Sequence, residues 1–458
     1  MLPAAVFCAR IVLWPVWEAT NHPTFWPLRP DFIDATEIES MSYRDLTWCA
    51  RTVAAGLFLL MLGCVTHANG QTQLQFEQCL VRLQPAAQKA GVDGASFRQF
   101  TQGTQADFTV LEKLDYQPEF KLPIWDYLAA LVDDERIADG REMLVRHAAV
   151  LQRIAAAYGV DPATVVAVWG VESNYGRITG KYPLVQALGT LSCFGRRQGY
   201  FQGEFFAALR ILQRGDIAPD RLYGSWAGAF GHTQFMPATY ERLAVDFDGD
   251  GRRDLVDNSA DALASTANFL RRGGWQSDLP WGFEVRLPPG FDSSLAGRKN
   301  KRPMSEWAAR GIVAVDGKNL ANSGLGDGER TAILLPAGPR GPAFIVTRNF
   351  DVIYGYNAAE SYALAIAHLA DSLRGGTPFV TPWPTDDAGL SRAERRELQT
   401  LLAARGHDIG EVDGALGERS RAAIKLEQAR LGQEATGRGG QKILNALRGG
   451  KPVQAPAQ

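Results

Sequence analysis

Apolar residues recur at helical spacing through most of the chain between residues 71 and about 370. One apolar face runs through residues 80–87, and a longer periodic stretch covers residues 137–158. Asp161 followed by Pro162 predicts the start of a further helix, because aspartate caps free N–H groups and proline suits the first helical turn. The pattern therefore predicts a mainly helical region of about 300 residues.

Strands and linkers have weaker but recognisable patterns. Residues 283–287 and 343–346 are short runs of strand-forming type, so strands are expected to be a minority. Residues 376–388 contain three prolines and no periodicity, which is typical of a linker between units that fold separately. Ser391 and Glu394 have the spacing of a capping box, which predicts that a small helical unit begins there.

These patterns predict a mainly α (α+β) chain in several parts. The expected division is a leader at 1–70, a large domain at 71–375, a linker at 376–388, a small three-helix domain at 389–449 and a tail at 450–458.

The leader has the layout of a secretory signal. An apolar run at residues 53–62 is too short to span a bilayer as a helix, and Arg44 and Arg51 precede it. Met41 lies at a suitable distance upstream and is the expected true start, and a genuine extension of 40 residues is the alternative. Export to the periplasm is the expectation.

The leader contains two alternative processing sites. Residues 66–68, Thr-His-Ala, suit simple cleavage after Ala68. Residues 61–64, Met-Leu-Gly-Cys, resemble a lipobox, which would make Cys64 a lipid anchor and the protein an outer-membrane lipoprotein.

Charge and cysteine content narrow the classes of function. The formal net charge of −2 argues against a nucleic-acid binder driven by bulk electrostatics. No CxxC or HExxH motif is present, so a zinc site is not expected. Outside the leader the cysteines are Cys79 and Cys193, which are either one disulfide or two buried thiols.

Glu172 is the candidate catalytic residue. It falls in the last turn of the helix capped by Asp161, within the segment Val-Glu-Ser-Asn-Tyr-Gly at 171–176. The negative end of a helix dipole disfavours an ionised carboxyl, and a carboxyl that stays protonated can donate its proton to a glycosidic oxygen. The alternative interpretation is an ordinary surface glutamate near a helix end.

Residues 224–240 mix small, aromatic and polar side chains. Small residues let the backbone approach a ligand, aromatic rings suit sugar faces, and Ser225 and Gln234 suit sugar hydroxyl and N-acetyl groups. A tightly packed junction between helices would have a similar composition.

The chain resembles the B-type lytic murein transglycosylases, family 103 of the glycoside hydrolases. The matching segments, in order over about 300 residues, are 169–176, 187–192, 196–197, 224–240 and 349–357. The resemblance implies a lysozyme-like transglycosylase domain in which Glu172 is the sole catalytic acid and base. It also implies substrate contacts from Ser173, Asn174, Tyr175, Arg196, Arg197, Ser225, Gln234, Tyr356 and Asn357. For Arg196 and Arg197 a solvated face, and for Tyr356 a core aromatic, are the alternatives.

The same resemblance implies chemistry with one carboxyl where ordinary glycosidases use two. Glu172 would protonate the oxygen between N-acetylmuramic acid and N-acetylglucosamine, and would then deprotonate the C6 hydroxyl, which closes onto C1. The product would be a 1,6-anhydromuramyl end, formed without water. A hydrolytic muramidase and a catalytically inactive peptidoglycan-binding scaffold are the two rival functions.

Residues 246–257 have the spacing of an EF-hand calcium loop. The expected ligands are Asp246, Asp248, Asp250, Asp254 and Asp257 with the backbone carbonyl of Arg252. Aspartate replaces the usual glutamate at the last position, and an acidic surface turn is the alternative. The related transglycosylases carry such a loop, so Ca²⁺ is the expected structural ion and no organic cofactor is expected.

Residues 389–449 resemble the three-helix peptidoglycan-binding domain that is attached to many wall enzymes. The matching residues lie at 410–417 and 420–424. Glu427 stands where that family usually has phenylalanine, and burial of an unpaired glutamate would be costly. The resemblance implies binding to peptidoglycan strands, and a helical unit that binds no glycan is the alternative.

Overall fold

The structure is a computed structural model, and it describes residues 72–115 and 122–449. The predicted leader, with Met41 and Cys64, and the tail at 450–458 lie outside the described residues. The chain divides into two compact units, Met1–Arg82 and Leu83–Gln458. Of the first unit, residues 72–82 are described and are helical; everything below concerns the second.

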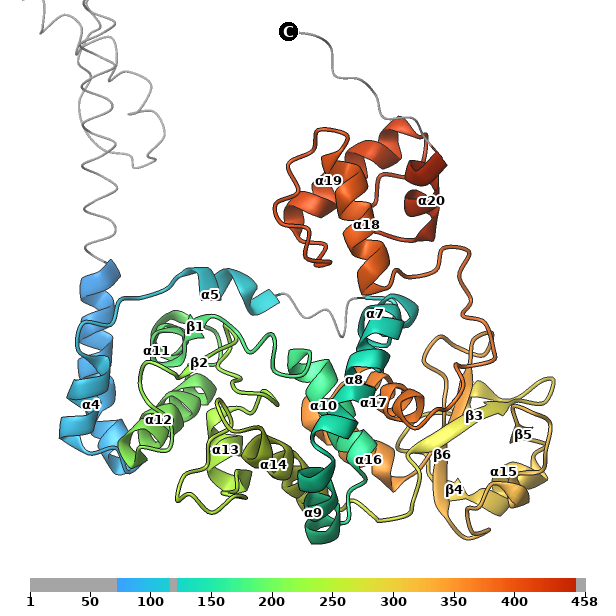
Figure 1. The fold of residues 1–458 in the computed structure, drawn as a ribbon, viewed down its shortest axis with the longest axis horizontal. Coiled ribbons are helices and arrows are strands. Elements are labelled where there is room, and N and C mark those ends of the chain that lie inside the picture. The colour runs from blue at the N-terminus through green and yellow to red at the C-terminus, as the bar shows by residue number, and fades with distance from the viewer. Residues whose placement is uncertain (1–71, 116–121, 450–458) are drawn as a thin grey trace, which may run out of the picture. The chain divides into compact units, whose positions relative to one another are not determined.

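Helices dominate the second unit, which confirms the mainly α prediction (Figure 1). Up to residue 272 they are α4 (Gly94–Thr101), α5 (Thr109–Glu112), α7 (Ile124–Leu131), α8 (Asp134–Arg146), α9 (Ala148–Tyr158), α10 (Pro162–Ser173), α11 (Leu184–Phe194), α12 (Gln198–Arg214), α13 (Pro237–Leu243) and α14 (Ser259–Arg272). Beyond it they are α15 (Met304–Ala309), α16 (Arg348–Asn357), α17 (Glu360–Leu373), α18 (Arg392–Ala403), α19 (Glu418–Arg430) and α20 (Gln441–Gly449).

The strands form two small antiparallel sheets. One joins β1 (Tyr182–Pro183) to β2 (Tyr223–Gly224). The other has the order β4-β6-β7-β3-β5, made of β3 (Gly282–Arg286), β4 (Arg302–Pro303), β5 (Val313–Ala314), β6 (Arg330–Leu334) and β7 (Ala343–Val346). Both predicted strands are confirmed in β3 and β7, within one residue at each end.

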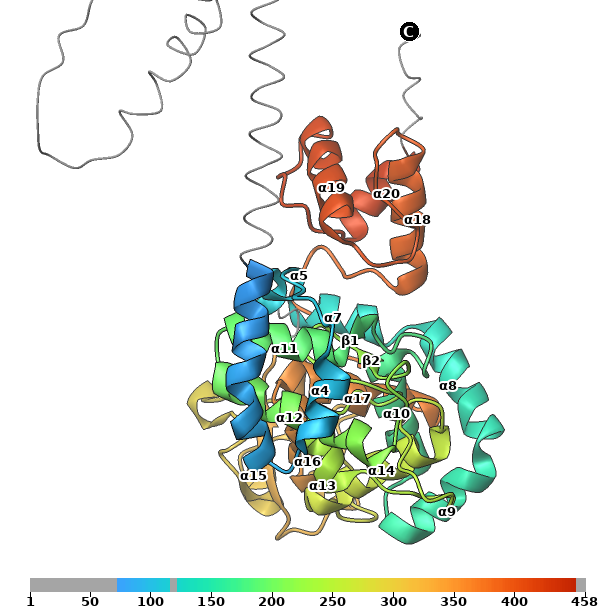
Figure 2. The same cartoon turned by 90° about the vertical axis from the view of Figure 1, so that its left-hand side faces the viewer.

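Helix α10 lies in the main hydrophobic core. Its residues 163–170 are all buried, so no side of the helix faces solvent along that stretch. It packs along α17, whose residues 362–367 are also buried, and against α8 and α14 (Figure 1, Figure 2). A helix that is apolar all round is stable only when other elements enclose it, and the surrounding helices do so here.

Two sequence expectations about helix ends are refined by the structure. Residues 137–158 form two helices instead of one continuous run, because the backbone at His147 (φ −104°, ψ 16°) leaves the helical conformation. Asp161 caps α10 as predicted, since its carboxylate accepts from the N–H of Thr164 at 3.1 Å. Among the described residues no single helix is long and apolar enough to cross a membrane; α9 and α10 reach that threshold only as a pair bent by 111°.

The C-terminal helices α18, α19 and α20 have their own core, which includes Leu398, Leu402, Ile424 and Leu444. The capping box is present, with Ser391 and Glu394 each bonding the other's backbone N–H. Glu427 is buried, as phenylalanine would be, but it is paired: its carboxylate is 2.7 Å from His407 Nε2 and accepts from Arg430 at 3.0 Å. These partners offset the desolvation cost that the sequence alone left unexplained.

Residues 376–388 have no helix or strand, as predicted, yet they are not a free tether. The ring of Phe379 stacks on His368 with centroids 3.9 Å apart, and burial lowers the pKa of His368 to about 4, which keeps it neutral. The N–H groups of Val380 and Thr381 both donate to the Glu284 carboxylate at 2.7 Å. Proline content indicated the lack of regular structure but not the aromatic and polar contacts of this segment. We call residues 376–388 the packed strap.

The small helical unit is docked on α7 and α8. Arg438 donates two hydrogen bonds to Asp126, at 2.7 and 2.6 Å, and Arg392 forms an ion pair with Asp133. Gly389 lies against α7 so closely that a Cβ there would be 2.8 Å from the Asp126 Cα. The two units therefore share an ionic, closely packed interface, and their separate folding stays a prediction.

We expect Gly389→Ala to lower the free energy of unfolding by about 1–3 kcal/mol, because the added methyl overlaps the α7 backbone. Gly328→Ala is the matched control, since a Cβ there meets nothing within 4 Å. Thermal unfolding of the two variants measures the difference. Equal stability would contradict the close docking of Gly389.

Candidate active site

Helix α10 ends in a turn of unusual backbone conformation directly after Glu172. Asn174, Tyr175 and Gly176 have φ of 50°, 60° and 82°, so three consecutive residues are left-handed. Such angles strain residues other than glycine, and they persist where surrounding contacts fix them. The turn halts the helix and leaves Glu172 half-buried in its last turn.

Contacts of the buried Tyr175 side chain hold this turn in place. Tyr175 is buried, its hydroxyl donates to the Arg136 carbonyl at 2.7 Å, and its ring lies edge-on to Trp169. Gly170 is required there, because a Cβ at that position would be 2.7 Å from the Tyr175 ring. Burial, the largest effect, raises the pKa of Tyr175 well above its usual value, so its hydroxyl remains a donor.

Ser173 connects the turn to the segment at 224–240. Its hydroxyl donates to the His232 carbonyl and accepts from the Gly176 N–H at 2.8 Å. Trp169 Nε1 donates to His232 Nδ1 at 3.1 Å. The side chains of Ser173 and Tyr175 are thus inside the protein, where they stabilise the turn and are not presented to a substrate.

Tyr362, at the start of α17, contacts the Glu172 carboxyl. Its hydroxyl donates a hydrogen bond to Oε1 of Glu172. Burial and then the neighbouring Glu172 raise the pKa of Tyr362 well above its usual value, so the phenol stays protonated and keeps donating. Sequence reasoning missed Tyr362, because nothing local marks a tyrosine 190 residues from its partner.

Tyr356 lies beside Tyr362, with the two rings nearly parallel and their centroids 6.3 Å apart. Its hydroxyl donates to the Thr233 carbonyl at 2.7 Å, which joins α16 to the 224–240 segment. Burial and then Glu172 raise the pKa of Tyr356 well above its ordinary value. Tyr356 therefore packs against the core and lies near the candidate acid, and a contact with substrate stays a prediction. Asn357, the next residue, is exposed.

The 224–240 segment is a compact loop with short bridges between Gly224, Phe230 and Phe235. The Ser225 hydroxyl accepts from the Ala229 N–H at 3.0 Å. Gln234 has φ 51° and donates from Nε2 to the carbonyls of Thr179 and Gly231, at 3.0 and 2.8 Å. Ser225 and Gln234 are half-buried and held in place, as residues that orient a ligand must be.

Arg196 and Arg197 are exposed between α11 and α12. The Arg197 guanidinium lies over the exposed ring of Tyr200, 4.5 Å from its centroid. The structure thus gives an accessible cationic and aromatic surface at this point. Cys79 and Cys193 are each disulfide-bonded; a bond between these two stays a prediction.

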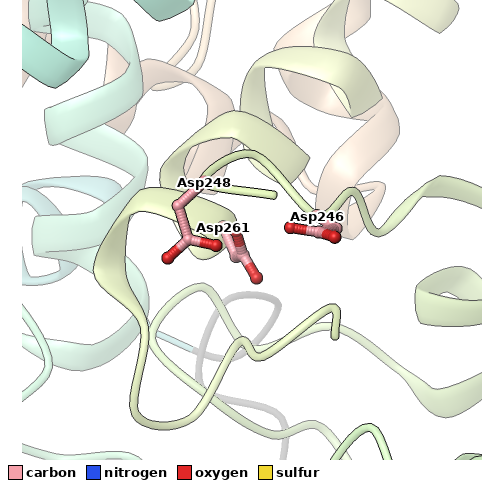
Figure 3. A group of neighbouring side chains, drawn as sticks. All are labelled: Asp246, Asp248 and Asp261. Atoms are coloured by element: carbon pink, nitrogen blue, oxygen red, sulfur yellow. The ribbon is translucent and has the colours of Figure 1, made fainter. Parts of the chain in front are cut away.

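The acidic loop at 246–257 gathers a different set of carboxylates from the one the spacing predicts. Asp246, Asp248 and Asp261 bring one oxygen each within 4.8 Å of the others (Figure 3). Asp257 is instead ion-paired with Arg221, and Asp254 accepts from the N–H groups of residues 256 and 257. The loop spacing did not predict Asp261, because this residue lies beyond the 12-residue loop, in the first turn of α14.

Electrostatics of the loop favour a cation. Asp261 is fully buried, and burial followed by the charges of Asp248 and Asp246 raises its pKa. It accepts from the N–H groups of Phe247 and Asp254, at 2.7 and 2.9 Å, which orients its oxygens. Three oxygen donors held close together despite their like charges form a set suited to a hard divalent ion.

Family comparisons match the chain in two places. A transglycosylase SLT domain family matches residues 75–371, and a peptidoglycan-binding domain family matches residues 391–447. The membrane-bound lytic murein transglycosylase B of Escherichia coli (strain K12) is 32% identical over 254 residues. That match spans 54% of this chain and 66% of the relative, just under two thirds of its length.

Solved structures show the same likeness. SltB3 from Pseudomonas aeruginosa, in complex with NAG-anhNAM-pentapeptide, has a TM-score of 0.66 and 47% identity, covering 81% of this chain and 99% of that chain. The Escherichia coli lytic transglycosylase Slt35, in complex with calcium, has a TM-score of 0.56 and 29% identity, covering 66% and 92%.

Proposed function

We propose that this chain, which belongs to the transglycosylase SLT domain family, is a peptidoglycan lytic transglycosylase with Glu172 as its single catalytic acid and base. The observation that carries the assignment of Glu172 is its position: it lies in the last turn of the enclosed helix α10 and receives a hydrogen bond from the buried Tyr362. The related SltB3 structure contains a NAG-anhNAM-pentapeptide, which is an anhydro product.

The proposed reaction cleaves the β-1,4 bond between N-acetylmuramic acid and N-acetylglucosamine. Glu172 gives its proton to the bridging oxygen as the glycosidic bond breaks. It then takes the proton of the C6 hydroxyl, whose oxygen bonds to C1, so the product is a 1,6-anhydromuramyl end and no water is consumed. Tyr362 orients the carboxyl in both steps, because a phenol that keeps its proton donates to Glu172 throughout.

Substrate contacts are proposed for six of the residues that the family resemblance assigns to the substrate. These are Arg196, Arg197, Ser225, Gln234, Tyr356 and Asn357. Ser173, Asn174 and Tyr175 are proposed to act indirectly, by holding the turn after Glu172. The division into a catalytic domain at 71–375 and a wall-binding domain at 389–449 is likewise our proposal, with 376–388 as a packed strap.

Calcium is the proposed ion of the acidic loop. Asp246, Asp248 and Asp261 would hold it, with Asp250 and the Arg252 carbonyl as the further candidates that the loop spacing supplies. The calcium complex of Slt35 supports this choice. Bound there, the ion would neutralise the buried charge of Asp261 and tie the loop to α14.

Export to the periplasm is proposed from the signal-like leader, with Cys64 as the candidate lipid anchor. The relative from Escherichia coli is described as membrane-bound, which supports a place at the envelope.

Glu172→Gln is expected to lower turnover roughly a hundredfold or more, because the amide keeps the shape but cannot supply a proton. The measurement is mass spectrometry of muropeptides released from purified sacculi, with anhydro ends as the readout. Unchanged thermal unfolding controls for the fold. Residual activity near the wild-type level would assign the acid elsewhere, and products heavier by one water would identify a hydrolase.

Tyr362→Phe is expected to lower kcat by about tenfold to a hundredfold with little change in KM, since it removes a hydrogen bond to an ionisable group and no substrate contact. Tyr354→Phe is the control, because that ring lies beneath Arg298 outside the site. A rise in KM alone would instead indicate that the Tyr362 hydroxyl binds substrate.

Calcium is expected to raise the melting temperature of the wild-type protein, because it binds the native state alone. Asp261→Asn should remove most of that increase. Asp257→Asn should retain it, because Asp257 is paired with Arg221. A melting temperature that does not change with calcium or with chelator would rule out a structural ion. An equal loss of the calcium-dependent increase in both variants would reject Asp261 as a ligand.

A further inference from the structure

We propose that Arg392, at the first position of α18 in the C-terminal helical unit, is a positioning residue for the turn that carries Glu172. Its guanidinium links that unit to Asn174, two residues after the proposed acid. The inference rests on the proposed function, because it assumes that the turn after Glu172 is part of the catalytic apparatus.

All three nitrogens of the Arg392 guanidinium donate hydrogen bonds. Nη1 donates to Oδ1 of Asn174 at 2.7 Å. Nε and Nη2 donate to the two carboxylate oxygens of Asp133 at 2.9 and 3.1 Å. Bidentate pairing of this kind fixes the orientation of the guanidinium plane, which a lysine ammonium would not do.

This cluster is shielded from solvent. The side chains of Arg392 and Asp133 are 14% and 3% exposed. Burial alone would raise the pKa of Asp133, but the hydrogen bonds from Arg392 and from the Arg136 N–H outweigh it and lower that pKa. The pair is therefore ionised at neutral pH and is of the kind whose loss leaves an uncompensated charge.

Asp133 connects two supports of the same turn. It caps α8 by accepting from the Arg136 N–H at 2.8 Å, and the Arg136 carbonyl accepts from Tyr175. Arg392 reaches the neighbouring Asn174 directly. Tyr175 is thus held from α8 and Asn174 from the C-terminal unit, and both belong to the left-handed turn that follows α10.

A shift of this turn would move Glu172 relative to the scissile oxygen. Misplacement of a reacting group by about 1 Å can cost on the order of a hundredfold in rate without weakening substrate binding. Asn174, in turn, has its side-chain oxygen engaged by Arg392 and is not offering it to a sugar. We therefore expect the contact to act on kcat, not on KM.

The test uses the full-length protein and soluble peptidoglycan fragments of defined length. The variants are Arg392→Ala, Asn174→Gly and the double variant, with Arg396→Ala as the matched control. Glycine keeps the left-handed backbone accessible while removing the amide. Arg396 lies one turn further along α18 and pairs with Glu135, without reaching the turn.

We expect Arg392→Ala to lower kcat by about tenfold to a hundredfold with KM changed less than about threefold. Asn174→Gly should lose a similar amount, the double variant should lose no more than either single one, and Arg396→Ala should match the wild type. Additive losses, or full kcat in Arg392→Ala, would overturn the proposal. Should Arg392→Ala fail to fold, full kcat in Asn174→Gly would overturn it equally.

The same assay separates this inference from the proposed function. Wild-type protein that releases no anhydro ends, or Glu172→Gln that still releases them, rejects the assigned chemistry whatever Arg392 does. Normal anhydro products from wild type, none from Glu172→Gln and full turnover in Arg392→Ala reject the positioning role alone.

Discussion

The enclosure of α10 is the constraint on which the rest of the structure depends. Residues 163–170 of this helix are buried on all sides, so α8, α14 and α17 must surround it. The helix is therefore partly accessible to solvent only at its two ends, and Glu172 is half-buried at the C-terminal one. A carboxyl attached to so rigid an element has little freedom, and the tyrosine of α17 that donates to it is equally fixed.

Local features were predictable from the sequence because their causes are local. The Asp161 cap, the Ser391–Glu394 capping box and strands β3 and β7 depend on residues close together in the chain. Periodicity supplied the mainly α class and the helix-end position of Glu172, and the resemblance to a known family supplied the lysozyme-like fold and the role expected of Glu172. Tyr362 and Asp261 were missed because each acts through a partner that the folded chain, not the local sequence, brings near.

Glu427 shows why residue type alone misjudges a core. Glutamate stands where the related domains usually have phenylalanine, which suggested a costly burial, and the side chain is indeed buried. Arg430 pairs with it from three residues further along the same helix, whereas His407 lies 20 residues earlier, where no sequence pattern marks it as a partner. Burial of a charge is tolerated where several partners are present, and those partners become visible only in the folded unit.

The packed strap between the two domains changes what the wall-binding domain can contribute. A flexible tether lets a bound module search a volume, and the gain is an effective concentration that varies with tether length. Residues 376–388 are not such a tether, because Phe379 stacks on His368 and two N–H groups of the segment donate to Glu284. If the C-terminal unit binds the wall as proposed, the packed segment would set the distance along the glycan strand between the bound sugars and the bond that is cut.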